Sequence, residues 1–117
     1  MSAFYLRIEQ GTTSQYAWPV TDDDNNAIAV SGYTGKAQVR LDPTATEVLH
    51  EWNTSPSGSG QSQMLMQGNL VILVTPPATS LAWTWKRGVY DILITAPDGT
   101  VSRVSEGVIE VSRSVTR

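Results

Sequence analysis

The chain has 117 residues, no cysteine and a formal net charge of -3. Folding a chain of this length buries about 12,000 Å² of surface, which suits one hydrophobic core and one domain over residues 1–117. The eight basic residues are scattered, and no apolar run approaches the roughly 20 residues that cross a bilayer. The N-terminus also lacks the basic start and apolar run of a signal peptide. We therefore expect neither a nucleic-acid partner nor a membrane partner.

Apolar and polar residues alternate through most of the chain, which indicates half-buried β-strands. Phe4, Leu6 and Ile8 begin this pattern, and Tyr16 and Trp18 continue it. The strands predicted after them lie near residues 27–30, 33–41, 48–52, 64–66, 70–75 and 87–112. Because turn residues separate these short strands at regular intervals, the pattern favours an antiparallel β-sandwich of about eight strands.

Three connecting or buried segments stand out from this alternation. Residues 54–63 are rich in serine and glycine and offer no side chain that could anchor a core, so they predict a flexible loop. Residues 70–75 are almost wholly apolar and predict a strand buried on both faces. Residues 76–83 begin with two prolines, and there one short helical turn competes with a strand.

The clearest element is a closing hairpin around the turn Pro97-Asp98-Gly99. Apolar and polar residues alternate on both sides of this turn. The period of two predicts that the core-facing residues are Tyr90, Ile92, Ile94 and Val104.

Few residues suggest metal or catalytic chemistry. The Asx run at 22–26 resembles the start of a calcium loop, but Ala27 and Tyr33 stand where an EF-hand needs glycine and glutamate, so a solvated turn is expected. His50 is the only histidine and is expected at the surface, between Leu49 and Glu51. These patterns predict no catalytic residue, no metal site and no cofactor.

Three carboxylates could form a pair for acid–base work. Asp91, Glu106 and Glu110 alternate with apolar neighbours in the closing hairpin. This spacing favours outward-facing charges that improve solubility or contact a partner.

Tryptophan is the more informative residue type. Trp18, Trp52, Trp83 and Trp85 cannot all fill one small core, so one or two of them are expected to face a partner or another subunit. A carbohydrate-binding platform is the alternative interpretation of the same aromatic residues. These four tryptophans are the candidate interface.

Several stretches are similar to a known group of proteins when read together. Residues 30–40 read Val-Ser-Gly-Tyr-Thr-Gly-Lys-Ala-Gln-Val-Arg, and residues 88–95 read Gly-Val-Tyr-Asp-Ile-Leu-Ile-Thr. Asp-Gly-Thr-Val-Ser-Arg follows at 98–103, and Glu-Gly-Val-Ile-Glu-Val-Ser at 106–112. In this order and spacing, over nearly the whole chain, they resemble small structural proteins of tailed bacteriophages and prophages.

The resemblance implies an immunoglobulin-like β-sandwich and a non-enzymatic role in the virion, assembled in the host cytoplasm. It implies a connector or adaptor in the tail, baseplate or fibre-attachment region. The implied partners are other phage structural proteins, with the chain itself present as a homo-oligomer or in repeated copies. A capsid decoration protein is the main alternative, and a small carbohydrate-binding module is another.

Overall fold

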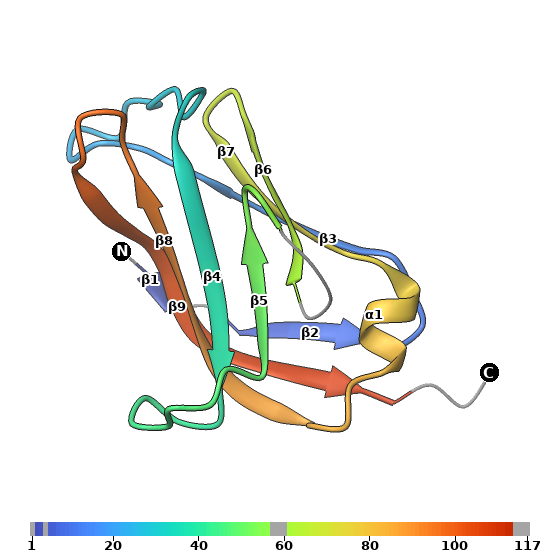
Figure 1. Cartoon of the computed structure of the whole chain (residues 1–117). Helices are drawn as coiled ribbons and strands as arrows, with labels where there is room; N and C mark the ends of the chain where they lie inside the picture. The colour runs from blue at the N-terminus through green and yellow to red at the C-terminus, as the bar shows by residue number, and fades with distance from the viewer. Residues whose placement is uncertain (1, 4, 57–60, 114–117) are drawn as a thin grey trace.

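The computed structural model describes residues 2–3, 5–56 and 61–113 (Figure 1). These residues form the strands β1 (Ser2–Ala3), β2 (Leu6–Glu9), β3 (Ser14–Pro19), β4 (Thr34–Arg40), β5 (His50–Asn53), β6 (Gln61–Gln67), β7 (Leu70–Thr75), β8 (Arg87–Thr95) and β9 (Val101–Ser112), and the helix α1 (Pro77–Leu81). The predicted all-β class is confirmed, and of the two alternatives left open at residues 76–83 the short helical turn forms. Among the described residues, no helix has the length and apolar character needed to cross a membrane.

The strands form one sheet that curls until it almost closes into a barrel (Figure 1). The strand order is β1-β9-β8-β4-β5-β6-β7-β3, and β2 also pairs with β9. The sheet turns a corner within strand β6, because residues 61–63 of this strand pair with β5 whereas residues 64–67 pair with β7. As a result β2 and β3 stand at the two ends of the sheet.

The predicted antiparallel pairing holds for most neighbours but is wrong in two places. Both β1 and β2 run parallel to β9, and β5 runs parallel to β6. Almost the whole chain separates β2 from β9, whereas only residues 54–60 separate β5 from β6. Local alternation does not indicate which strands pair or in which direction they run.

One hydrophobic core fills the inside of the curved sheet, because alternate strand residues point inward. The prediction for the closing hairpin is confirmed, since Tyr90, Ile92 and Ile94 are buried and Val104 is half-buried against the core. Val104 is the extra residue of an irregularity in the β8–β9 register. The hairpin turn also forms as predicted, with Gly99 at a φ of 93°.

Two further predictions are wrong in part. Strand β7 buries only alternate residues, so it has one buried face and one half-buried face. The predicted loop at 54–63 ends earlier, because residues 61–63 belong to β6 and Ser62 is buried. A serine on the inward face of a strand can be buried when it has a polar partner, which here is His50. Residues 57–60 lie outside the described part of the chain.

Candidate functional site

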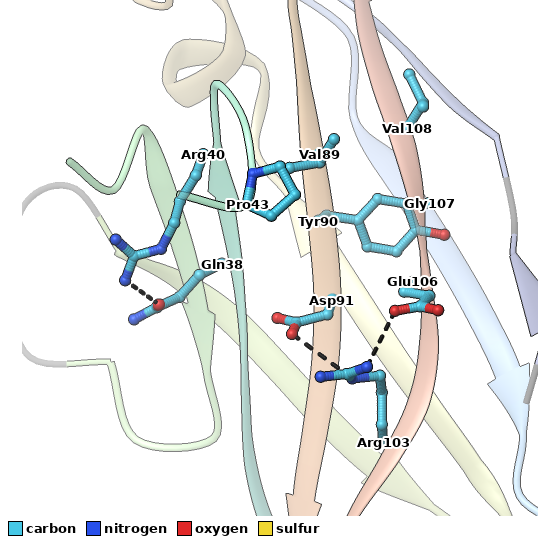
Figure 2. A pocket seen from close by; sticks show the side chains of 10 residues that line it. All are labelled: Gln38, Arg40, Pro43, Val89, Tyr90, Asp91, Arg103, Glu106, Gly107 and Val108. Carbon is cyan, nitrogen blue, oxygen red and sulfur yellow. Dashed lines mark hydrogen bonds and ion pairs between the residues drawn. The ribbon is translucent and has the colours of Figure 1, made fainter. Parts of the chain in front are cut away.

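A hollow lined by both apolar and charged residues lies on the outer face of β4, β8 and β9 (Figure 2). We call it the outer groove; its volume is about 550 Å³. Its lining residues are Gln38, Arg40, Pro43, Val89, Tyr90, Asp91, Arg103, Glu106, Gly107 and Val108. These residues come from segments far apart in the sequence, which the sheet brings together.

Two rows of side chains cross the three strands and build the outer groove. Gln38 is opposite Asp91, which is opposite Glu106 on β9. In the second row, Val89 lies between Arg40 and Val108. Directly opposed residues on one face of a sheet are close enough to touch, so the groove has one polar row and one row with an apolar part.

Arg103 links the two carboxylates of the polar row. Its guanidinium lies 3.7 Å from the Asp91 carboxylate and 3.1 Å from the Glu106 carboxylate (Figure 2). All three side chains are between about a third and a half exposed. An exposed cation between two carboxylates offers both signs of charge to a partner. The predicted outward direction of Asp91 and Glu106 is confirmed.

Glu110 belongs to a different neighbourhood. It lies opposite Arg7 of β2 and Arg87 of β8 in the strand register. A hydrogen bond to Glu110 raises the pKa of Tyr5, with smaller contributions from burial and the charge of Glu110. The structure therefore does not bring the three predicted carboxylates together.

Arg40 holds one wall of the outer groove in place. Its guanidinium donates to the backbone carbonyls of Ala45 and Thr46, at 2.9 and 2.7 Å, and to the Gln38 side chain at 3.0 Å. Asp42 tightens the same wall by accepting a hydrogen bond from the Thr44 amide at 2.8 Å. Hydrogen bonds from Thr44 lower the pKa of Asp42. The wall is thus fixed by polar contacts.

The polar surface continues from the outer groove across β5. Glu51 accepts hydrogen bonds from the side-chain amides of Gln38 (2.7 Å), Asn53 (3.1 Å) and Gln61 (2.8 Å). Burial raises the pKa of Glu51, but the hydrogen bonds from Gln38 and Asn53 outweigh it and the pKa is lowered overall. Glu51 is therefore charged at neutral pH and ties three strands together.

A second region, which we call the aromatic cluster, consists of His50, Trp52, Trp83 and Trp85. The His50 ring lies 4.8 Å from the Trp52 ring and 4.9 Å from the Trp83 ring, both edge-on. Trp83 and Trp85 lie 4.7 Å apart, tilted by 33°. The Trp52 indole N–H donates to the Thr75 hydroxyl at 3.1 Å. These contacts join β5 to the segment after α1.

The prediction of a surface His50 is wrong, because His50 is only 3% exposed. Its inward direction follows from the register of β5, in which His50 and Trp52 are buried and Glu51 is not. The His50 Nε2 atom lies 2.7 Å from the Ser62 hydroxyl oxygen. Burial lowers the pKa of His50 to about 4, against a small opposing effect of Glu51, so the ring is neutral at pH 7.

The four tryptophans of the candidate interface divide into two pairs. Trp18 and Trp52 are buried in the core, at 7% and 1% exposure, so they do not offer a surface. Trp83 and Trp85 are half-buried, outside any strand, and pack against the core from its edge. The Trp85 indole nitrogen is buried and has no hydrogen-bond partner among the described residues. Of the four tryptophans, this second pair is the more exposed.

The Asx run at 22–26 forms the predicted turn. Asp22 accepts hydrogen bonds from the amides of Asp24 and Asn26, both at 2.9 Å, and Asn25 has a φ of 65°. Over the described ranges, no three His, Asp or Glu side chains gather as a metal site would require. The Asp22 carboxylate is occupied by its own turn.

Sequence reasoning did not single out Gln38, Arg40 and Arg103. Each stands at an outward position of a strand or of its end, which alternation alone could have indicated. Their convergence depends on β4 and β9 both lying beside β8, which only the pairing reveals. A scan against protein-family models and a search of curated proteins give no match to this chain.

Proposed function

We propose that the chain is a non-enzymatic structural protein of a tailed-phage particle, acting as a connector or adaptor in the tail, baseplate or fibre-attachment region. One observation carries this proposal. The segments that resemble phage structural proteins, at residues 30–40, 88–95, 98–103 and 106–112, fall on or beside β4, β8 and β9. These are three adjacent strands, and their outward residues line the outer groove.

The composition of the outer groove fits contact with another protein. Val89 and Val108 give it an apolar row, with Arg40 at the other end of that row and the oppositely charged Arg103 and Glu106 beside it. Protein interfaces commonly combine an apolar centre with a polar rim, and Arg is enriched in them. We infer that the groove is the surface on which a neighbouring subunit of the particle docks.

Trp83 and Trp85 are proposed as a second contact surface. Leu81, at the end of α1, is 44% exposed beside them in the sequence, so the segment presents apolar area at the surface. Trp is the residue type most enriched at the energetic centres of interfaces. Two separate contact surfaces are what a connector between larger components needs.

The topology supports an immunoglobulin-like arrangement as the finer fold. The adjacent strands β3, β7 and β6 follow one another in the sheet in the same order as the second, fifth and fourth strands of such domains. The adjacent strands β9, β8 and β4 follow the order of the seventh, sixth and third strands, and β5 is an additional strand beside them. The corner in β6 joins the two layers into one continuous sheet.

Immunogold labelling tests the location of the chain. Antibodies raised against the purified chain would be applied to gradient-purified particles from cells that carry its gene. Gold at the tail or baseplate is the expected result, whereas gold over the capsid would support the decoration alternative. Unlabelled particles, with the chain left at the top of the gradient, would contradict a virion role.

A pair of variants tests the surface. Val108→Asp places a charge in the apolar row of the outer groove, while Val101→Asp makes the same change on β9 outside it. We expect only Val108→Asp to lose attachment among variants that still fold. Glycan-array binding by the isolated chain, lost in Trp83→Ala, would instead favour the carbohydrate-binding alternative.

A further inference from the structure

The two ends of the curled sheet leave an opening between β2 and β3. We propose that this opening, which we call the seam, accepts an extended segment of a partner protein, which pairs with the backbone of β3 as an additional strand. From the pairing along the sheet, β2 and β3 run in opposite directions. A segment antiparallel to β3 is therefore parallel to β2. The inference concerns a surface separate from the outer groove.

On its seam side, the backbone of β3 has hydrogen-bonding groups that find no partner among the described residues. The Val20 amide donates to the Asn69 carbonyl at 2.8 Å, which fixes which residues of the strand face β7. In an antiparallel pair these residues alternate, so Tyr16 and Trp18 direct their N–H and C=O groups toward β7. Gln15 and Ala17 direct theirs into the seam. An edge of this kind is a template for another strand.

The backbone of β2 faces the same opening. Gln10 donates its amide to the Ser112 carbonyl at 2.9 Å, so the alternate residues Arg7 and Glu9 point their backbone groups away from β9. The Glu9 carbonyl accepts hydrogen bonds from Thr12, and the Arg7 carbonyl accepts one from the Tyr16 hydroxyl. Within the described residues, the amides of Arg7 and Glu9 have no acceptor.

A side chain, rather than a strand, bridges the two edges. The Tyr16 hydroxyl reaches from β3 to the Arg7 carbonyl on β2. A hollow of about 460 Å³ lies at this place, between Arg7 and Glu9 on one side and Ser14, Gln15 and Tyr16 on the other. The hollow is thus bordered by backbone donors and acceptors on both sides.

The edges specify the chemistry of the occupant. Alternating N–H and C=O groups match only the backbone of an extended polypeptide. The seam side of β3 carries no charged side chain, and its exposed residues Gln15 and Ala17 admit a neighbouring strand. Pro19 has no N–H, which limits pairing to a few residues. Inward-facing side chains of the segment meet the Tyr16 ring, which packs 6.2 Å from Trp18, so apolar residues fit there.

Amide hydrogen exchange of the free chain, followed by NMR, tests whether the edge is open. We expect the Gln15 and Ala17 amides to exchange more than about a hundredfold faster than those of Tyr16 and Trp18. Equal protection of all four amides would overturn the proposal, because it would mean that the edge is already paired.

Peptide selection tests the occupant. The probe is a yeast-displayed library of random peptides of about nine residues, selected for binding to the purified chain. We expect the selected peptides to alternate apolar residues and to shift the amide signals of Arg7, Glu9, Gln15 and Ala17. Selected peptides that shift only the outer groove or the aromatic cluster, or a library without any binder, would refute a strand site.

Two matched comparisons complete the test. Ala17→Pro removes a seam-facing N–H without removing a bond to β7 and should weaken peptide binding about tenfold or more, whereas Ala17→Val keeps the N–H and should bind normally. If Ala17→Pro does not fold, N-methylation of alternate peptide amides blocks the same hydrogen bonds on the unmodified chain. Unchanged affinity of the methylated peptides would rule the pairing out. Immunogold labelling of particles tests the proposed function, and its outcome is independent of these peptide-binding results.

Discussion

The two faces of β5 create opposite chemical environments one residue apart. On the outer face, Glu51 accepts three side-chain hydrogen bonds and stays charged. On the inner face, His50 has one hydroxyl partner, contacts two tryptophan rings and is neutral. The comparison shows that the face of the strand on which a titratable side chain lies decides whether its charged or its neutral form is favoured. The outer face of β5 therefore holds its titratable residue charged, and the aromatic cluster holds its titratable residue neutral.

The largest expected effect comes from the inner face. Trp52→Ala removes a fully buried ring, its contact with His50 and its hydrogen bond to Thr75. We expect the free energy of unfolding to fall by about 3 to 5 kcal/mol, measured by urea denaturation. Glu51→Ala, on the outer face of the same strand, should cost only about 1 kcal/mol. Similar losses for both variants would contradict the difference between the faces.

The next effect is a pH dependence that belongs to His50. An unfolded histidine has a pKa near 6.5, and burial lowers the pKa of His50 to about 4 in the folded chain. Between these values the unfolded state binds more protons than the folded state. The contribution of His50 to the free energy of unfolding is therefore fully present above pH 6.5 and is lost as the pH falls toward 4. The total loss is about 3 kcal/mol.

Thermal unfolding measured from pH 7 to pH 4 checks this dependence. His50→Gln keeps a polar group near Ser62 but cannot gain a proton, so its curve should lack the histidine part of the decline. Carboxylates titrate in both proteins, and the difference between the curves isolates the contribution of His50. Parallel curves would mean that His50 reaches water in the folded state.

Alternation predicted the faces of strands well where the apolar residues were unambiguous. Tyr90, Ile92 and Ile94 were placed correctly because the polar residues Asp91 and Thr95 occupy alternate positions between and after them. His50 was misplaced because Leu49 is apolar and His50 is not, although the structure buries the histidine more deeply. A polar residue can take an inward position when another strand supplies its partner, which local sequence does not reveal.

The candidate site was less predictable than the strands, for a related reason. The outer groove depends on β8 lying between β4 and β9, and Arg103 reaches Asp91 from a distance of twelve positions in the sequence. The alternation at Asp91 and Glu106 indicated outward charges but not the cation between them. Likewise, residues 61–63 read as a loop because a parallel pairing with β5 leaves no local pattern.

A moderate effect is expected at Gly88, where β8 leaves little room beside β4. A Cβ atom at Gly88 would lie 2.7 Å from the Arg40 carbonyl oxygen and 2.8 Å from a methyl group of Val39. Gly88→Ala should therefore force the strands apart and cost about 1 to 3 kcal/mol in urea denaturation. The neighbouring exposed substitution Arg87→Ala should cost far less. An unchanged midpoint for Gly88→Ala would show that the two strands can separate without loss.

The smallest effect on stability, and the one most specific to function, is expected at Arg103. Its contacts with Asp91 and Glu106 are exposed to water, so Arg103→Ala should change the free energy of unfolding by less than about 1 kcal/mol. The same change leaves two carboxylates in the outer groove without their cation, which alters the charge that a docking subunit meets. We therefore expect fewer copies of this variant per particle, measured by quantitative immunoblotting of gradient-purified particles. Lys86→Ala removes one positive charge outside the groove and should be incorporated normally. If both variants were incorporated like the original chain, the groove would not be the surface that holds the chain in place, whatever its location in the particle.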